Sequence, residues 1–338
     1  MMTAAQKRRL SIAAERLNVK KFQLAKALQI KMGETAAPAP GGKVDDDPLR
    51  GPVNMQWPEL IEPEKTEFSN IVDEILDAMP KQDTSKYTKL DQDNLWVWGG
   101  PTPFWGGSMA DDTLIRGAQY FDAQNVVYVY GPTDEKMMKL HSGFKRMLCQ
   151  INSQCRTPGA QGNMDDESNA ERLSLLSLQF PNIVGAMCDD VTTYFNHMVL
   201  PEAFEARCRG LKKHNSKLKM YGVIYAHELL QKDFSLILPY LDTVNLWFWN
   251  MNEILEYDYY LDLCREKLPG KPVLQGIFLH EYGISDSGNL PSLLIHQLNK
   301  AREYMTKGAV EGAVILGDRE IKKWPESSAA VRNYLLNQ

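Results

Sequence analysis

Residues 272–283 read PVLQGIFLHEYG, and this stretch decides how the rest of the chain is interpreted. An apolar run follows a Lys-Pro turn and ends in His280, Glu281 and Tyr282. A parallel strand that is buried on both faces has this pattern, because only its carboxyl end can deliver polar groups to a pocket. The pattern recurs at residues 182–190 (NIVGAMCDD), 219–228 (KMYGVIYAHE), 242–250 (DTVNLWFWN) and 312–318 (GAVILGD). If these stretches are neighbouring strands of one barrel, their polar ends converge on a single cleft.

The strand pattern is regular from residue 94 onward. Apolar strand candidates begin near residues 94, 125, 144, 182, 219, 242, 272 and 312. Their average spacing is about 31 residues, the length of a strand, a loop and a crossover helix. Helical spacing of apolar residues fills the intervals, at residues 109–121, 133–140, 166–178, 201–214, 229–240, 252–267, 290–307 and 321–336. Eight strand-helix pairs predict an α/β fold, the (β/α)₈ TIM barrel, here with an N-terminal helical extension.

A doubly wound open sheet is the alternative arrangement of alternating strands and helices. Such a sheet typically carries a glycine-rich phosphate loop after its first strand. Here the first strand candidate leads into Trp98-Gly-Gly-Pro-Thr, which does not match GxGxxG. The barrel is therefore favoured.

Three segments precede the repeating part. Residues 1–35 are predicted to be a basic helical extension or tail, with eight basic residues against two acids. The run AAERLNVKKFQLAKALQI has a faint helix-turn-helix pattern, but a solvated helix or partly ordered tail is favoured. Residues 36–52 form a Pro/Gly/Asp linker. The barrel domain is then expected over residues 53–338, with a leading helix at 64–79 that plugs or braces the barrel floor.

Composition narrows the class of protein. The 338 residues are 43% hydrophobic and 24% charged with a net charge of −5, which is ordinary for a globular domain and argues against nucleic-acid binding. Five cysteines form no CxxC pair, so neither a disulfide framework nor a zinc ribbon is indicated. No apolar run reaches the roughly 18 residues of a membrane span. We expect a cytoplasmic protein, or a secreted or periplasmic one if an export signal has been removed; the oligomeric state is left open.

Aromatic rings, carboxylates and amides gather at the predicted carboxyl ends of the strands, where the active site of such a barrel lies. Aromatic faces stack on the apolar faces of sugar rings, and carboxylates and amides hydrogen-bond to the hydroxyls. The predicted ligand is therefore a carbohydrate, and no metal or cofactor is predicted. The predicted substrate-binding residues are Trp98, Trp105, Tyr130, Asn152, His227, Glu228, Trp247, Trp249, Asn250, His280 and Tyr282.

Side-chain alternation along the strands predicts which residues face the barrel interior. In the seventh strand, Gln275 should avoid the apolar helix layer, so Gln275, Ile277, Leu279 and Glu281 are expected to point inward. By the same reasoning, Asn245 in the sixth strand predicts that Trp247 and Trp249 point inward. In the fourth strand two inner sets are equally compatible with the sequence, namely Gly185, Met187 and Asp189 or Ala186, Cys188 and Asp190.

Carboxyl groups on strands four and seven suggest a reaction. Glycoside hydrolysis uses two carboxyl groups across the scissile bond. The stretches GAMCDDVTTYF, GIFLHEYG and KAREYMTKGAVEGAVILG resemble those of uncharacterised bacterial barrel proteins of the glycoside hydrolase type. In the large retaining clan the acid/base follows strand four and the nucleophile follows strand seven. The resemblance implies Asp189 or Asp190 for the first role and Glu281 for the second. The chain departs from the clan in having Cys188-Asp189-Asp190 where the clan has Asn-Glu.

Structural interpretations compete with the catalytic one. Asp189 and Asp190 could cap the following turn, His227 and His280 could be hydrogen-bonded supports, and the strand-six tryptophans could fill the core. Two other functions remain: a metal-dependent sugar isomerase or lyase, and a carbohydrate-binding barrel without catalysis. The sequence contains neither the HxH nor the HExxH spacing that would support an isomerase. Its ligands would come from Asp189, Asp190, His227, Glu228, His280, Glu281 and Asp318.

Overall fold

A computed structural model describes most of the chain. The described residues are Ile12, Glu15, Arg16 and residues 64–101, 108–151, 165–191, 201–249, 251–281 and 287–338. Within these ranges, backbone alone is described for Glu64, Lys65, Phe68, Glu281, Ser287, Asp318 and Arg319. The predicted linker at residues 36–52 and almost all of the predicted extension at 1–35 lie outside the described residues.

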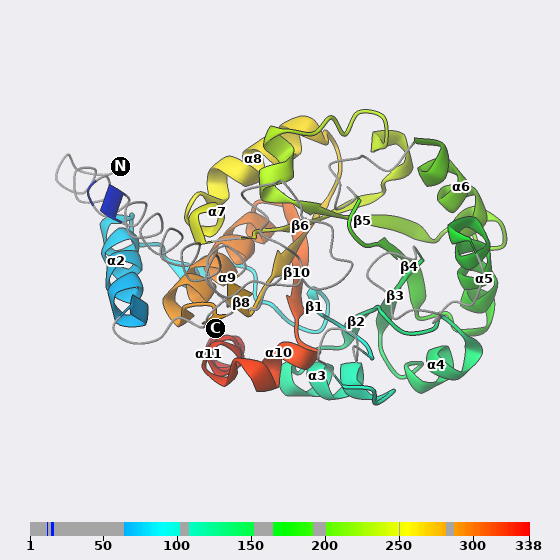
Figure 1. Ribbon diagram of the computed structural model, residues 1–338, viewed down its shortest axis with the longest axis horizontal. Helices are drawn as coiled ribbons and strands as arrows, with labels where there is room; N and C mark the ends of the chain where they lie inside the picture. Colours follow the sequence, from blue (N-terminus) through cyan, green and yellow to red (C-terminus); the bar gives the residue numbers. More distant parts are fainter. Residues whose placement is uncertain are drawn as a thin grey trace, which may run out of the picture.

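The described strands form a closed barrel in which every neighbouring pair is parallel (Figure 1). Sequence order is kept around the barrel, and the last strand closes it by pairing with the first. Its strands are β1 (Leu95–Gly99), β2 (Asn125–Tyr128), β3 (Arg146–Gln150), β4 (Ile183–Cys188), β5 (Lys219–Tyr225), β6 (Thr243–Trp247), β7 (Val273–Ile277) and β10 (Val310–Leu316). Each lies where the apolar runs predicted it, so the TIM-barrel prediction is confirmed.

Helices surround the barrel (Figure 1). They are α3 (Thr113–Phe121), α4 (Glu135–Leu140), α5 (Asp166–Gln179), α6 (Pro201–Lys212), α7 (Met251–Leu255), α8 (Tyr257–Lys267), α9 (Pro291–Thr306), α10 (Asp318–Lys323) and α11 (Pro325–Asn337). Side-chain caps begin two of them: Asp134 accepts from the Met137 N–H at 2.9 Å, and Asp165 accepts from the Ser168 N–H at 2.7 Å. None of the helices in the described ranges is long and apolar enough to cross a membrane.

The helix expected at residues 229–240 is absent. All residues between β5 and β6 are described, and they form two short 3₁₀ turns, η3 (Ala226–Leu230) and η4 (Leu238–Tyr240). Asp233 accepts a hydrogen bond from the Ser235 N–H at 2.9 Å, which offers the backbone a turn in place of a helix. Pro239 removes a further backbone donor. Phe234 and Ile237 are buried anchors of this turn, and their spacing resembled that of a helix.

A separate helix, α2 (Glu64–Ala78), precedes β1 as predicted. Its buried side chains Ile71, Val72 and Ile75 join the core between strands and helices. Figure 1 shows α2 beside α9 on the outside of the helix ring. It therefore braces the barrel from the side and does not plug the floor.

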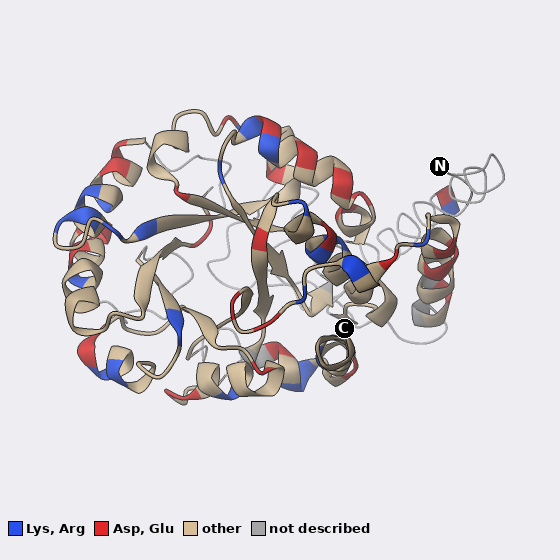
Figure 2. Ribbon diagram, turned by 180° about the vertical axis from the view of Figure 1, so that it is seen from behind, with Lys and Arg blue, Asp and Glu red and all other residues tan. Residues whose placement is uncertain are grey.

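The exposed face of α2 is acidic (Figure 2). Arg16 of the N-terminal extension is in helical conformation and pairs with Glu74 of α2 at 2.6 Å. Both side chains are about half exposed, so the pair contributes at most about 1 kcal/mol.

The barrel interior is filled by a cluster of large side chains distinct from the outer core. Among the described residues its members are Trp96, Trp98, Val127, Val129, Leu148, Met187, Tyr221, Val223, Trp247, Leu274, Phe278, Val314 and Leu316. Trp247 is therefore inside, as predicted from Asn245, whose Oδ1 accepts from Trp247 Nε1 at 2.7 Å.

The orientation predicted for β7 was wrong. Leu274 belongs to the interior cluster, whereas Val273 and Ile277 pack in the outer core, so Gln275 faces the helices. Its amide Nε2 donates to the carbonyl oxygens of Leu246 and Gly276, both at 2.9 Å. Because main-chain acceptors lie within reach, a polar side chain is accommodated in the apolar helix layer.

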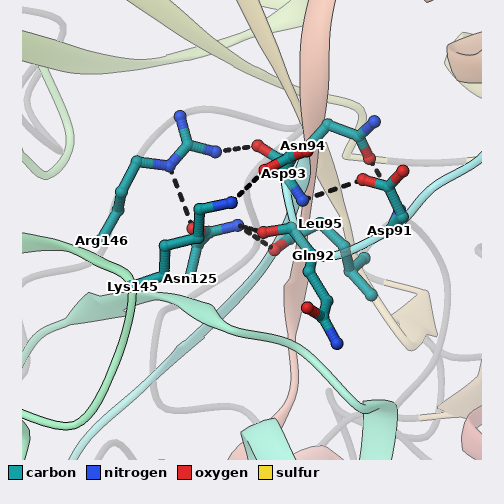
Figure 3. Close-up of polar contacts among 8 residues, drawn as sticks. All are labelled: Asp91, Gln92, Asp93, Asn94, Leu95, Asn125, Lys145 and Arg146. Carbon is teal, nitrogen blue, oxygen red and sulfur yellow. Dashed lines mark hydrogen bonds and ion pairs between the residues drawn. The ribbon is translucent and has the colours of Figure 1, made fainter.

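The amino ends of the first three strands are tied by polar contacts (Figure 3). Asn125 Nδ2 donates to the carbonyl oxygens of Gln92 and Leu95, both at 2.9 Å. Arg146 Nε donates to Asn125 Oδ1 at 3.0 Å and a second guanidinium nitrogen contacts the Asp93 carbonyl. These residues stabilise the floor of the barrel, and the predicted functional residues lie at the other end.

Candidate active site

Some predicted site residues cannot be placed. Trp105, Asn152, Asn250 and Tyr282 lie outside the described residues, and Glu281 is described by its backbone alone. The described part of the site consists of side chains at and just beyond the carboxyl ends of β1, β2, β4, β5, β6 and β7.

Asp189 and Asp190 directly follow β4 and are each 5% exposed. Met187 lies in the interior cluster and Cys188 in the outer core, so the inner set that the sequence left open is the one with Met187 and Asp189. Asp190 then breaks the alternation, because its backbone is left-handed with φ of 46°. A non-glycine residue in this conformation costs free energy and is often found at functional sites.

A tyrosine from the next strand holds the Asp190 carboxylate. Tyr225, the last residue of β5, donates its phenol hydroxyl to Asp190 Oδ1 at 2.6 Å. The left-handed turn thus directs the carboxyl group of Asp190 toward β5. Tyr225 was not predicted from the sequence, because it lies within the apolar run KMYGVIYAHE and nothing local distinguishes it from a core residue.

Tyr225, His227 and Trp249 form one partly exposed surface, which we term the aromatic wall. The rings of Tyr225 and His227 are nearly parallel, with centroids 5.8 Å apart and 7° between the planes. Trp249 stands edge-on to both, at 4.8 Å from Tyr225 and 5.9 Å from His227. His227 and Trp249 were predicted from the sequence, and the structure brings them together around Tyr225.

A buried carboxylate lies behind the aromatic wall. Glu253 of α7 is 2% exposed, and its Oε1 lies 3.3 Å from Nδ1 of His227. Its other oxygen accepts the backbone N–H of Trp249. Glu253 thus joins the segments that follow β5 and β6, and it was not predicted from the sequence.

Trp98 and Trp247 lie beneath this surface. They are 3% and 2% exposed and meet edge to face, with centroids 5.7 Å apart. Trp98 Nε1 donates to the Tyr130 hydroxyl at 3.0 Å, and Tyr130 is a second strand-end residue with positive φ, 69°. The Tyr130 N–H donates to Gln150 Oε1 of β3 at 2.9 Å. Trp98 was predicted to bind substrate; it lies within β1, which buries its ring.

Glu228 and His280 have structural partners. Glu228 is 1% exposed, and its carboxylate accepts the Tyr225 N–H at 3.1 Å, which caps η3. The His280 ring, 4% exposed, stacks on Trp324 with centroids 4.5 Å apart. Its Nδ1 lies 3.8 Å from the buried Glu320 carboxylate of α10.

The Glu281 backbone continues from β7 at the same end of the barrel. His280–Glu281 (β8) pairs antiparallel with Ser287–Gly288 (β9). Just before it, the Phe278 ring contacts Trp247 at a centroid distance of 4.4 Å and Trp249 at 6.2 Å. Glu281 therefore follows a ring that packs against the aromatic wall.

The described side chains do not gather as a metal centre. No group of three His, Cys, Asp or Glu residues in the described ranges is arranged to hold a metal ion. A hollow of about 450 Å³ does occur near the amino end of β1, lined in part by Leu95, Tyr120 and Arg332. It lies at the end of the barrel opposite Asp190.

No protein-family model matches the chain, and no curated protein matches its sequence. Solved structures similar to it include a chitinase from Bacteroides thetaiotaomicron, with 8% identity and a TM-score of 0.49 over 74% of this chain and 98% of that one. Another is the catalytic domain of a family 18 chitinase from the fern Peteris ryukyuensis, with 14% identity and a TM-score of 0.43 over 72% and 99%. A third is a β-glucuronidase from Ruminococcus gnavus, with 9% identity and a TM-score of 0.49 over 73% and 49%. These likenesses concern the barrel fold alone.

Proposed function

We propose that the protein hydrolyses a glycosidic bond at the carboxyl ends of its barrel strands, with Asp190 and Glu281 as the pair of carboxyl groups. The observation that carries the proposal is the Asp190 carboxylate, held at 2.6 Å by the hydroxyl of a ring that belongs to an accessible aromatic wall. Flat rings beside a fixed carboxylate suit a substrate with apolar ring faces and an acid-labile bond, which describes a glycoside.

Asp190 is favoured over Asp189 as the strand-four carboxyl group. Tyr225 joins Asp190 to the aromatic wall, and the left-handed backbone at Asp190 turns its side chain toward that wall. The phenol donates to Asp190, so this carboxylate acts as an acceptor, which suits a nucleophile or a base. Glu281 is then the proton donor. These roles are the reverse of those implied by the resemblance to the retaining clan.

A panel of 4-nitrophenyl glycosides tests the function. We expect the wild type to cleave at least one member, and Asp190→Asn and Glu281→Gln each to lower kcat/KM by about 10²-fold or more, as for loss of an acid or base. Asp189→Asn is the neighbouring control and should retain activity within about tenfold. Asp111→Asn, which removes a surface ion pair with Lys136, should change nothing.

The same panel separates the alternatives. If Asp190→Asn keeps wild-type activity, the carboxyl pair is wrong. If the wild type binds sugars, as followed by tryptophan fluorescence, yet cleaves none, the barrel is a carbohydrate-binding protein. For an active wild type, azide should restore turnover of Asp190→Ala and yield a glycosyl azide, since the small anion replaces the missing carboxylate.

A further inference from the structure

We infer that Glu253 is a positioning residue that fixes the tautomer of His227, so that Nε2 of His227 is the polar group with which the aromatic wall recognises a substrate hydroxyl. The inference rests on the proposed action on a carbohydrate and deepens it.

The Glu253 carboxylate determines which ring nitrogen of His227 carries a hydrogen. A carboxylate accepts hydrogen bonds and cannot donate them. Oε2 of Glu253 accepts the Trp249 N–H, and Oε1 lies 3.3 Å from His227 Nδ1. Nδ1 must therefore carry the hydrogen, whether the imidazole is neutral or protonated. In the neutral ring this leaves Nε2 as an acceptor.

The contact with Glu253 also orients the imidazole ring of His227. The Glu253 side chain is 3% exposed and the His227 side chain is 24% exposed. The Nδ1 edge of the imidazole faces the buried carboxylate, so the edge that bears Nε2 is the accessible one. Because the ring is nearly parallel to Tyr225, which holds Asp190, this edge belongs to the same surface as the proposed catalytic carboxylate.

Burial distinguishes the His227–Glu253 pair from an ordinary surface ion pair. His214 and Glu171 form another His-Glu contact, at 3.2 Å between Nε2 and Oε1. Their side chains are 33% and 37% exposed, in the turn after α6 and on α5 respectively, so solvent competes with the contact. Glu253 by contrast is buried, and burial of a carboxylate is unfavourable unless its hydrogen bonds are satisfied. A neutral glutamine could also accept the Trp249 N–H, but it would present an amide donor, in place of an acceptor, to His227 Nδ1.

Glu253→Gln is therefore a sharp probe. If the glutamine oxygen keeps the Trp249 N–H, its amide NH₂ faces His227 Nδ1 and requires Nδ1 to accept. The variant preserves the shape of the side chain and inverts the hydrogen-bonding role of Nε2. We expect long-range ¹H–¹⁵N spectra of the imidazoles, recorded at about pH 8 where free histidine is neutral, to show the Nδ1–H tautomer for His227 in the wild type. The spectrum of Glu253→Gln should shift toward Nε2–H.

This measurement needs no substrate, so its failure is distinct from failure of the proposed function. His227→Asn assigns the signal, and Glu171→Gln is the matched control that should leave it unchanged. An Nε2–H tautomer in the wild type, or the same tautomer in wild type and Glu253→Gln, would overturn the inference. Should Glu253→Gln not fold, the wild-type spectrum alone decides the tautomer.

Kinetics test the contact with substrate. With the 4-nitrophenyl glycoside that the wild type cleaves best, we expect Glu253→Gln to raise KM about tenfold while kcat stays within about threefold, because a substrate hydroxyl loses its acceptor. His227→Asn should raise KM similarly. The monodeoxy analogue that lacks the recognised hydroxyl should bind wild type and Glu253→Gln equally. A KM that is unchanged in both variants, or raised equally for every analogue, would show that Nε2 does not contact the substrate.

Discussion

Gly276 shows how a single residue shapes the barrel interior. A Cβ added to Gly276 would lie 2.0 Å from the Trp247 ring, far inside contact distance. Trp247 in turn contacts Phe278 and Trp98, the layer beneath the aromatic wall. The absence of a side chain at position 276 therefore lets an indole lie flat against β7 and support the site.

Gly276→Ala is expected to destabilise the fold by about 2–3 kcal/mol or more, because the indole must leave its rotamer or the strand must shift. Urea denaturation measures the change. Gly143→Ala is the matched control: a Cβ there meets nothing within 4 Å, and its effect should be within about 0.5 kcal/mol. Equal stabilities of the two variants would contradict the packing described here.

At the scale of elements, Arg207 joins α6, α5 and β4. It is 8% exposed and donates through NH1 to Cys188 Sγ at 3.2 Å and through Nε to Asp166 Oδ2 at 3.0 Å. Burial raises the pKa of the Cys188 thiol to about 11, so the thiol is neutral at physiological pH and acts as the acceptor. Cys188 directly precedes Asp189 and Asp190, so this buried pair holds the end of β4 from which the chain leads to Asp190, the proposed nucleophile or base.

Arg207→Met should cost about 3–5 kcal/mol, because it removes the buried guanidinium that pairs with the Asp166 carboxylate. Chemical denaturation gives the free energy of unfolding. Arg209→Met is the control on the same helix: Arg209 pairs with Glu167 through two contacts of 2.8 and 2.9 Å, but the side chains are 60% and 39% exposed. That variant should lose no more than about 1 kcal/mol. A similar loss in both variants would show that burial is not what makes Arg207 important.

At the scale of the whole molecule, the buried His141 and the partly buried His296 make stability depend on pH. Burial, followed by the nearby Lys300 charge, lowers the pKa of His296 to about 4 from 6.5. Burial also lowers the pKa of His141. Below the unfolded pKa the unfolded chain binds protons that the folded chain does not, so the folded state loses stability as pH falls from about 6.5 toward 4.

His296→Leu should remove part of this dependence, by about 2 kcal/mol between pH 7 and pH 4. The free energy of unfolding measured by urea across this range checks the value. His214→Asn changes a partly exposed histidine and should leave the slope as in the wild type. If the pH dependence of the unfolding free energy is unchanged in His296→Leu, folding does not lower the pKa of His296.

The strands of this barrel could be predicted from the sequence because the signal is local. A parallel strand covered on both faces is apolar along most or all of its length, as in β4, and eight such runs at regular spacing predict a closed sheet. The prediction of a helix at residues 229–240 was wrong for a related reason. Apolar residues at helical spacing report burial, and the anchors of an irregular turn are buried too.

The sequence by itself determined the barrel and the end of it at which polar groups gather, since both follow from the order of apolar and polar residues along each strand. Only the tertiary structure decided which polar groups meet. Gln275 turned outward because carbonyl oxygens of β6 and β7 were available, and Tyr225 and Glu253 joined the site through partners 35 and 26 positions away. Hydrogen bonds between such distant residues depend on positions in space, and no local pattern of residue types encodes them.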